Sequence, residues 1–238
     1  MSEIINKNIL VTGASRGIGA AIKSVCEKQG AKVIAHASRP SVNTDDSFLY
    51  EDLSLAGAGE RLFKAALKTV DHIDAVVNNA GIYIPSTLSG ADWNEGWTKT
   101  MAVNVQAPAD ICRAAIAHYR DTNGGRIVNI ASRAGHRGDG IDHAAYAASK
   151  GAILAMTKTW ARALSGENIH LYGIAPGWVE TRMAPQDIEN RKKAVADIPL
   201  GRVALPEEVA NLVAFLLSDA CPSAVGATFD VNGASYVR

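Results

Sequence analysis

Short apolar runs alternate with longer helical patterns along the chain. The runs are continuous, which is typical of strands buried on both faces of a parallel sheet. Their alternation with helical segments indicates successive βαβ units, and predicts an α/β fold with a doubly wound parallel sheet and helices on both faces. We expect strands near residues 9–12, 32–37, 75–78 and 127–130, and helices near residues 17–29, 57–70, 92–119 and 144–164.

One domain accounts for the length of the chain. The 238 residues fit one α/β unit, without an internal repeat, low-complexity tract or linker. We therefore expect a single domain over residues 1–238. Residues 182–200 are rich in charge, and we expect them to form a mobile lid.

The expected helix over residues 144–164 lacks a clear polar face. Residues 145–156 are apolar or small nearly all round, unlike a helix with one face in water. Such a surface needs a cover, which another subunit can supply. We therefore predict a homo-oligomer, with a homotetramer as the first choice and a dimer as the alternative.

Composition and charge limit the kinds of partner that we expect and indicate the cellular compartment. The 24 Lys and Arg balance 24 Asp and Glu, and no apolar run approaches the roughly 18 residues that span a bilayer, so we expect no nucleic-acid or membrane partner. Three widely spaced cysteines without a CxxC pair, and histidines without ligand spacing, predict neither disulfides nor a metal. Residues 1–12 run directly into a strand without a leader pattern, so we expect a cytoplasmic protein.

A glycine-rich turn joins the first strand to the first helix. Its sequence is Thr12-Gly13-Ala14-Ser15-Arg16-Gly17-Ile18-Gly19. Glycine lets the backbone approach a pyrophosphate closely, and the N-terminus of the following helix attracts negative charge. The turn therefore predicts a dinucleotide site, although a tight turn without a ligand fits the same spacing.

Further motifs follow in order. Asn78-Asn79-Ala80-Gly81 ends the fourth strand, and Asn104 lies in the next long helix. Ser132 follows the fifth strand, and Tyr146-Ala147-Ala148-Ser149-Lys150 has YxxxK spacing. After the sixth strand come Pro176, Gly177 and Thr181.

Together these motifs resemble the short-chain dehydrogenase/reductase family over residues 7–233. The resemblance is closest to the 3-oxoacyl-[acyl carrier protein] reductases, whose ending is similar to residues 225–233. It implies a Rossmann fold and a catalytic tetrad of Asn104, Ser132, Tyr146 and Lys150. The implied cofactor-binding residues are Gly13, Ser15, Arg16, Gly17, Ile18, Gly19, Ser38, Arg39, Asp52, Leu53, Asn79, Ala80, Gly81, Tyr146, Lys150, Pro176, Gly177, Val179 and Thr181.

The resemblance also implies individual roles. Lys150 would bond the nicotinamide ribose, Thr181 the carboxamide and Asp52 the adenine. Asn104 would hold a water that links Lys150 to solvent. As a bare carboxylate, Asp52 is equally a candidate helix cap.

Tyr146 and Lys150 also predict chemistry by their spacing. Four residues apart in a helix, they lie on one face. A free tyrosine has a pKa of about 10, so acting near pH 7 requires that its phenolate be favoured by roughly 4 kcal/mol. Lys150 and an oxidised nicotinamide supply the positive charge, which makes Tyr146 a general acid for ketone reduction and a base for alcohol oxidation. Ser132, at the carboxyl edge of the sheet, can bond the substrate oxygen or cap a turn.

The end of the second strand indicates which nicotinamide cofactor binds. An acidic residue there would accept from a ribose 2′-hydroxyl and repel a 2′-phosphate. This chain instead has Ser38 and Arg39, with Arg16 in the glycine turn, and guanidinium groups suit a phosphate dianion. We predict NADPH (NADP+) in preference to NADH; the alternative is that Arg39 is a solvated loop residue.

The substrate is predicted as a small carbonyl or alcohol, with a carrier-bound 3-oxoacyl group as the leading candidate. The lining segments 82–85, 133–137 and the loop after Gly177 give apolar walls with cations at Arg133 and His136. The 3-oxoacyl reductases carry a basic residue just before the sixth strand, where this chain has Ser165-Gly166-Glu167-Asn168. A free small molecule therefore stays an alternative.

Two other classes of function fit the sequence less well than an enzyme of this kind. A non-catalytic NAD(P)-binding sensor would typically lose the tyrosine or the lysine, and both are present. An epimerase or dehydratase of the extended branch needs a separate C-terminal substrate domain, for which the chain is too short. The enzyme interpretation is favoured over both.

Overall fold

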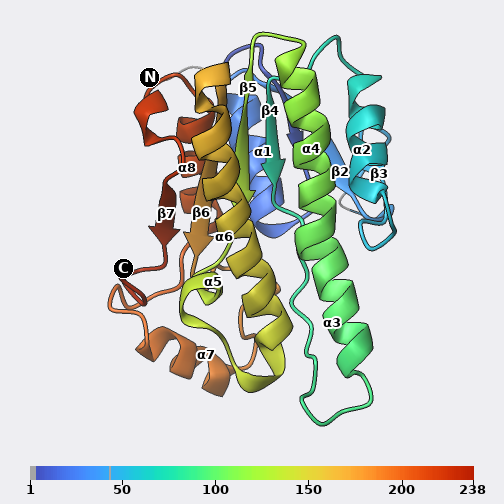
Figure 1. Cartoon of the computed structure of the whole chain (residues 1–238). Helices are drawn as coiled ribbons and strands as arrows, with labels where there is room; N and C mark the ends of the chain where they lie inside the picture. Colours follow the sequence, from blue (N-terminus) through green and yellow to red (C-terminus); the bar gives the residue numbers. More distant parts are fainter. Residues whose placement is uncertain (1–3, 43) are drawn as a thin grey trace.

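The computed structural model describes residues 4–42 and 44–238, with a seven-stranded parallel sheet at its centre (Figure 1). The strand order is β3-β2-β1-β4-β5-β6-β7, so the winding reverses beside β1 and a doubly wound sheet results. The predicted fold class is confirmed. The strands are β1 (Asn8–Val11), β2 (Lys32–Ala37), β3 (Leu49–Tyr50), β4 (Ala75–Asn78), β5 (Gly125–Ile130), β6 (Ile169–Pro176) and β7 (Thr228–Val231).

Helices cover both faces of this sheet (Figure 1). Helices α1 and α8 pack together on one face, and α2, α4 and α6 cover the other. The shorter α3, α5 and α7 lie toward the carboxyl ends of the strands. The helices are α1 (Gly17–Lys28), α2 (Ala58–Leu67), α3 (Trp93–Met101), α4 (Ala107–Arg120), α5 (Ala134–Arg137), α6 (Ala144–Leu164), α7 (Ile188–Ala196) and α8 (Pro206–Leu217).

Successive strand residues enter opposite core layers. In β1, Ile9 and Val11 pack with α1 and α8, whereas Leu10 packs with α2, α4 and α6. In β4, Val77 and Val76 divide in the same way. Because both faces are covered, both side-chain directions must be apolar, which explains the continuous apolar runs.

The long helical pattern over residues 92–119 forms three elements. A π-helical turn, Ala102–Gln106, separates α3 from α4 and contains the predicted site residue Asn104. One widened turn hardly changes the apolar periodicity, so the pattern did not reveal it, although such turns recur at functional sites. Helix α6, in contrast, has the predicted bounds of 144 and 164.

A buried chain of hydrogen bonds fixes α6 on the sheet. The Asn78 side-chain amide donates to Asn129 Oδ1 at 2.8 Å, and the Asn129 amide donates to Thr157 Oγ1 at 2.9 Å. The Thr157 hydroxyl then donates to the carbonyl oxygen of Ile153 at 2.8 Å. These bonds join the ends of β4 and β5 to the helix that carries Tyr146, so they set the position of the predicted site.

The charged segment 182–200 contains α7, none of whose residues is buried. The Asp187 carboxylate caps this helix by accepting from the Asn190 backbone N–H at 2.9 Å. Its mobility as a lid stays a prediction.

Across the described residues, no helix has both the length and the apolar character needed to traverse a bilayer.

Candidate active site

The carboxyl edge of the sheet brings the sequence motifs together. The glycine turn follows β1, Ser38 and Arg39 follow β2, residues 79–81 follow β4, and Ser132 closely follows β5. Pro176 ends β6, and Val179 behind it pairs with Ala204 in an isolated bridge. Open α/β sheets bind ligands at this edge, where the strand order reverses.

The glycine turn has the shape of a phosphate cradle. Gly13 and Gly17 have φ values of 66° and 55°, which favour glycine. A side chain at Gly19 would collide with the Gly13 carbonyl oxygen, so α1 begins close against the turn. Thr181 contacts this turn as well, because a Cβ at Gly17 would lie 3.1 Å from its methyl group.

Thr12 ties the glycine turn to the Asn79-Ala80-Gly81 segment. Its hydroxyl accepts from the backbone N–H groups of Asn79 at 3.0 Å and Ala80 at 2.9 Å. The Asn79 side chain returns the contact by donating to the Thr12 and Gly13 carbonyl oxygens at 2.9 and 3.2 Å. The sequence motif predicted Thr12 only as part of the turn. Its position directly after β1 is the feature that could have indicated this supporting role.

His36 is a second supporting residue that sequence analysis missed. The Gly13 N–H donates to His36 Nδ1 at 3.2 Å, so Nε2 carries the proton and donates to the Glu51 carbonyl oxygen at 2.9 Å. Burial lowers the pKa of this imidazole, which keeps it neutral. His36 therefore joins the glycine turn to the segment after β3.

A cavity of about 560 Å³ lies against the glycine turn. A dinucleotide fits this part of the site because the turn is an open cradle and both Arg16 and Lys23 contribute cationic groups to the walls. Sequence analysis did not single out Lys23. The lining residues are Ala14, Ser15, Arg16, Gly17, Ala20, Lys23, Asp45 and Phe48.

The remaining predicted cofactor residues lie around this cavity and the strand ends. Ser38 and Arg39 are exposed directly after buried Ala37. Asp52 Oδ1 accepts from the Ser54 N–H and hydroxyl at 2.9 and 2.7 Å, so Asp52 closes a turn and does not cap α2, whose N-cap is Gly57. Ile18 and Gly177 are partly buried, whereas Leu53, Gly19 and Pro176 are buried.

The predicted catalytic residues Ser132, Tyr146 and Lys150 come together where β5 meets α6. The Ser132 hydroxyl lowers the pKa of Tyr146, and the Lys150 ammonium lies 5.7 Å from the centre of the Tyr146 ring. Lys150 Nζ donates to the Ile130 carbonyl oxygen at 2.8 Å. A Cβ at Gly81 would lie 3.5 Å from Lys150 Nζ, so the segment after β4 borders the same ammonium.

Asn104 is held by the segment after β4. Its Oδ1 accepts from the Ile82 N–H at 2.8 Å, and its Nδ2 donates to the Ile82 carbonyl oxygen at 2.9 Å. The same Nδ2 donates to Ser149 Oγ at 3.1 Å. The π-helical turn thus directs Asn104 toward the segment beside Lys150, and its expected water remains a prediction.

Burial dominates the pKa values of Tyr146 and Lys150. Burial raises the pKa of Tyr146 to about 12; the bond with Ser132 opposes this rise, and the charge of Asp139 adds to it. Burial alone lowers the pKa of Lys150 to about 8. Near neutral pH, Tyr146 carries its proton and Lys150 is largely cationic, which is the state a proton donor for ketone reduction needs.

Aromatic side chains form a wall beside Tyr146. The Tyr83 ring lies 4.8 Å from the Tyr146 ring and edge-on to it, and stacks on His143 at 3.9 Å. The Trp178 ring is also edge-on to the Tyr83 ring, with 6.2 Å between the two ring centres. The Tyr83 side chain also bonds to Asp139, and burial raises its pKa well above the ordinary value.

The two cations expected at the substrate end lie in different settings. Arg133 is buried next to Ser132. His136 instead stacks on Tyr236 at 5.7 Å, and burial lowers its pKa, so His136 is neutral near pH 7. The expectation of a cationic His136 is therefore wrong, because the ring packs against the C-terminal segment.

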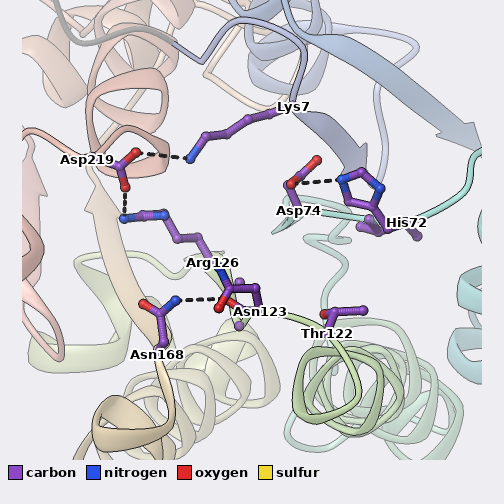
Figure 2. Close-up of a pocket in the computed structure, with 11 residues that line it drawn as sticks. Lys7, His72, Asp74, Thr122, Asn123, Arg126, Asn168 and Asp219 are labelled. Atoms are coloured by element: carbon purple, nitrogen blue, oxygen red, sulfur yellow. Dashed lines mark hydrogen bonds and ion pairs between the residues drawn. The ribbon is translucent and has the colours of Figure 1, made fainter.

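A second pocket, of about 280 Å³, lies at the opposite edge of the sheet (Figure 2). Its charged groups are already paired: Asp219 lies 3.7 Å from Lys7 Nζ and accepts from Arg126 at 2.5 Å. His72 pairs with Asp74 at 3.2 Å. Because the pocket lies at the amino ends of the strands, the candidate active site is the one at the carboxyl edge.

No cluster of three or more potential metal ligands occurs in the parts of the chain that the structure describes.

A glycine cradle, a cavity with cationic walls, and a half-buried tyrosine beside a buried serine and lysine at one sheet edge define a dinucleotide-dependent oxidoreductase. Residues 13–234 match the model of a protein family described as enoyl-(acyl carrier protein) reductase. The chain belongs to the short-chain dehydrogenase/reductase family.

Relatives and solved structures are similar over nearly the whole chain. The 3-oxoacyl-[acyl-carrier-protein] reductase FabG of Vibrio cholerae is 33% identical over 97% of this chain and 98% of its own length. FabG of Escherichia coli is 31% identical over the same shares.

Two solved structures extend the comparison to three dimensions. The Pseudomonas aeruginosa RhlG/NADP complex has a TM-score of 0.90 and 30% identity, covering 99% of this chain and 98% of its own. An NADP-bound 3-oxoacyl (acyl-carrier-protein) reductase from Agrobacterium tumefaciens has a TM-score of 0.88 and 33% identity, covering 97% and 95%. The chain is an NAD(P)-dependent short-chain dehydrogenase/reductase.

The lowered pKa of Lys150 predicts how stability depends on pH. This pKa falls from an ordinary 10.5 to about 8 on folding, so between these values the unfolded chain binds more protons than the folded protein. Stability lost by burying the ammonium is therefore regained as pH rises through that window. We expect Lys150→Met to raise the free energy of unfolding of the cofactor-free protein most below pH 8, with a gain that shrinks toward pH 10.

Urea unfolding at several pH values from about 6.5 to 10 measures this difference. Lys158→Met, which removes an exposed ammonium from the same helix, is the control and should show no comparable trend. A gain for Lys150→Met that is constant across the range contradicts the assigned pKa.

Proposed function

We propose that the protein, as one domain over residues 1–238, interconverts a ketone and a secondary alcohol by hydride transfer with NADPH. The observation that carries this proposal is the buried Lys150 ammonium 5.7 Å from the centre of the Tyr146 ring, where buried Ser132 also acts on the tyrosine. The glycine turn and its cavity lie at the same sheet edge, which supports a nicotinamide cofactor as the redox partner.

Each catalytic side chain has a separate task in the reducing direction. Reduced nicotinamide, when bound, supplies a hydride to the carbonyl carbon. Tyr146 donates its proton to the carbonyl oxygen, so one C–H and one O–H bond form while the C=O π bond breaks. Ser132 donates a hydrogen bond to that oxygen, and the Lys150 charge stabilises the phenolate left on Tyr146.

Reprotonation of Tyr146 needs a path from solvent. We assign to Asn104 the water that links Lys150 to solvent, since Asn104 is fixed to Ile82 and Ser149 beside that ammonium. Lys150 and Thr181 are proposed to hold the nicotinamide ribose and carboxamide.

NADPH is proposed in preference to NADH. The end of β2 has no carboxylate next to the 2′ position, and Arg16 and Arg39 are exposed where they can pair with a 2′-phosphate. Lys23 adds a cation to the wall of the cavity. Both compared structures are NADP complexes, which supports the same cofactor here.

Two substrate classes have specific support. Similarity to 3-oxoacyl-[acyl-carrier-protein] reductases supports a carrier-bound 3-oxoacyl group. Against carrier docking, Glu167 stands just before β6 and forms a two-pronged ion pair with Arg120, at 2.6 and 3.0 Å, which neutralises a cation that an acidic carrier would need. A free small ketone or alcohol is therefore the second candidate.

We propose a homo-oligomer, and specifically a tetramer, that covers the outer face of α6. Ala144, Ala148, Ala155 and Ala163 are exposed along this helix, and a flat, small-residue face allows close packing of a second copy. We also propose a cytoplasmic location, supported by free thiols at Cys26, Cys112 and Cys221.

Replacing Tyr146 with Phe removes the proposed proton donor but keeps the ring. We expect turnover of any ketone substrate to fall at least roughly 100-fold, with the Kd for NADPH changed less than about threefold. A carbonyl and alcohol panel, including 3-oxoacyl and enoyl thioesters, is followed by NADPH absorbance. Tyr236→Phe, which keeps the ring stacked on His136, is the control; near-parental turnover of Tyr146→Phe would refute the mechanism.

Replacing Arg39 with Ala should weaken NADPH binding more than NADH binding. A charge-assisted hydrogen bond contributes about 1.5–3 kcal/mol, so we expect the NADPH Kd to rise roughly 10- to 100-fold. Ser38→Asp should shift the preference further, because a carboxylate repels the phosphate. Fluorescence titration measures both cofactors, with Lys28→Ala as the charge-matched control at the far end of α1. Equal affinity of the parent protein for NADH and NADPH would contradict this assignment.

The oligomer is tested by molar mass. We expect light scattering to give about four times the chain mass of 25.1 kDa, and Ala148→Glu, which places a charge on the outer face of α6, to lower that mass. Ala117→Glu, on the exposed side of α4, tests whether that helix shares the interface. A monomeric parent protein overturns the proposal.

A further inference from the structure

Arg133 is a buried cation without a partner. Its side chain follows the catalytic Ser132 directly and only 5% of the residue is exposed. Nη1 is fully buried and has no hydrogen-bond partner, and none of the ion pairs among the described residues includes Arg133. Buried polar groups are nearly always paired, so an unpaired guanidinium indicates a group that binds there.

The backbone holds Arg133 firmly beside the catalytic residues. Its N–H donates to the Pro176 carbonyl oxygen at 3.0 Å, which fixes it to the end of β6. Two residues later, a Cβ at Gly135 would lie 2.6 Å from the Lys150 carbonyl carbon, so α5 rests directly on the helix that carries Tyr146. The backbone at Arg133 therefore cannot leave the neighbourhood of the site without moving α5.

The charges around Arg133 locate it at the substrate end. Asp139 and Asp197 attract its positive charge, and Arg137 opposes it, while burial lowers its pKa more than any of these. Asp139 is engaged by the Tyr83 side chain and accepts from the Gly140 N–H at 2.8 Å. Arg133 directly precedes α5 and Asp197 directly follows α7, and Figure 1 shows α5 and α7 toward the same end of α6.

We infer that Arg133 forms an anion-binding subsite next to the catalytic residues, and that the substrate is a small oxo acid whose carboxylate pairs with this guanidinium. A guanidinium stays protonated and presents a planar fork that matches a carboxylate with two parallel hydrogen bonds. The inference rests on the proposed ketone reduction and selects its free small-molecule form, because the ketone of a 3-oxoacyl thioester has no carboxylate nearby.

The position of Arg133 also restricts the length of the substrate. Adjacent Cα atoms are about 3.8 Å apart, so the backbone of the subsite lies next to the serine that is assigned to the reacting oxygen. The reach of the arginine side chain then sets the length of the chain between ketone and carboxylate that fits. The aromatic wall at Tyr83 and Trp178 can pack against that chain.

Selectivity between an oxo acid and its methyl ester tests the subsite. Oxo acids with one, two or three methylene groups between ketone and carboxylate are compared with their esters, using NADPH and the ratio of kcat/KM values. We expect the acid to be preferred at the length that fits, and Arg133→Met to reduce that preference roughly 10- to 100-fold. Arg133→Lys should recover part of it, because it restores the charge without the fork.

The matched control is Arg137→Met, which removes an exposed guanidinium from the same short helix and should keep the preference of the parent protein. Equal loss in Arg137→Met and Arg133→Met shows a general electrostatic effect and overturns the subsite. An unchanged preference in Arg133→Met, or preference for the ester in the parent, overturns it as well. A ketone phosphate preferred over every oxo acid overturns the carboxylate assignment.

Binding without turnover separates this inference from the proposed function. In Tyr146→Phe with NADP+, calorimetry with the preferred oxo acid should give a Kd that rises roughly 10- to 100-fold when Arg133→Met is added. If the parent reduces no carbonyl but this shift occurs, the proposed function fails and the subsite stands. If ketones are reduced but the shift is missing, the subsite fails and the proposed function stands.

Discussion

The buried hydrogen bonds from Asn78 through Asn129 to Thr157 are the constraint on which the site depends. They join β4, β5 and α6 at the carboxyl edge, where the strand ends deliver the glycine turn, Ser132 and the segment after Asn78. Breaking these bonds would leave buried polar groups without partners, which favours one register of α6 on the sheet. That register determines whether Tyr146 meets Ser132.

The same helix presents a buried ammonium, and the chain just after β5 presents a buried guanidinium. Lys150 has one backbone partner, the Ile130 carbonyl oxygen, and Arg133 has none among the described side chains. Each charge is destabilising in the empty protein, because burial removes water without replacing it. A bound anionic or electron-rich group would offset this loss of stability. The two cations therefore make the liganded protein more stable than the empty one.

Sequence patterns predicted the strands and helices in which apolar or small residues follow a regular spacing. Continuous apolar runs gave buried parallel strands, and the small-residue stretch gave α6 with its bounds. Other features depend on contacts between distant segments. The role of His36 requires its ring to meet both Gly13, 23 residues earlier, and Glu51, 15 residues later, and the π-helical turn at Asn104 leaves the periodicity almost unchanged. Burial of Arg133 and neutrality of His136 likewise follow from packing, which residue type alone does not reveal.

The chain has no net charge, so attraction of anionic ligands must come from local groups. In the proposed site, the cofactor cations Arg16 and Arg39 are exposed, and their fields are screened within roughly 8 Å at physiological salt. The proposed substrate cations Arg133 and Lys150 are buried and therefore screened far less. In this proposal, salt acts mainly on the binding of the cofactor, because solvent ions do not reach the charges beside Tyr146.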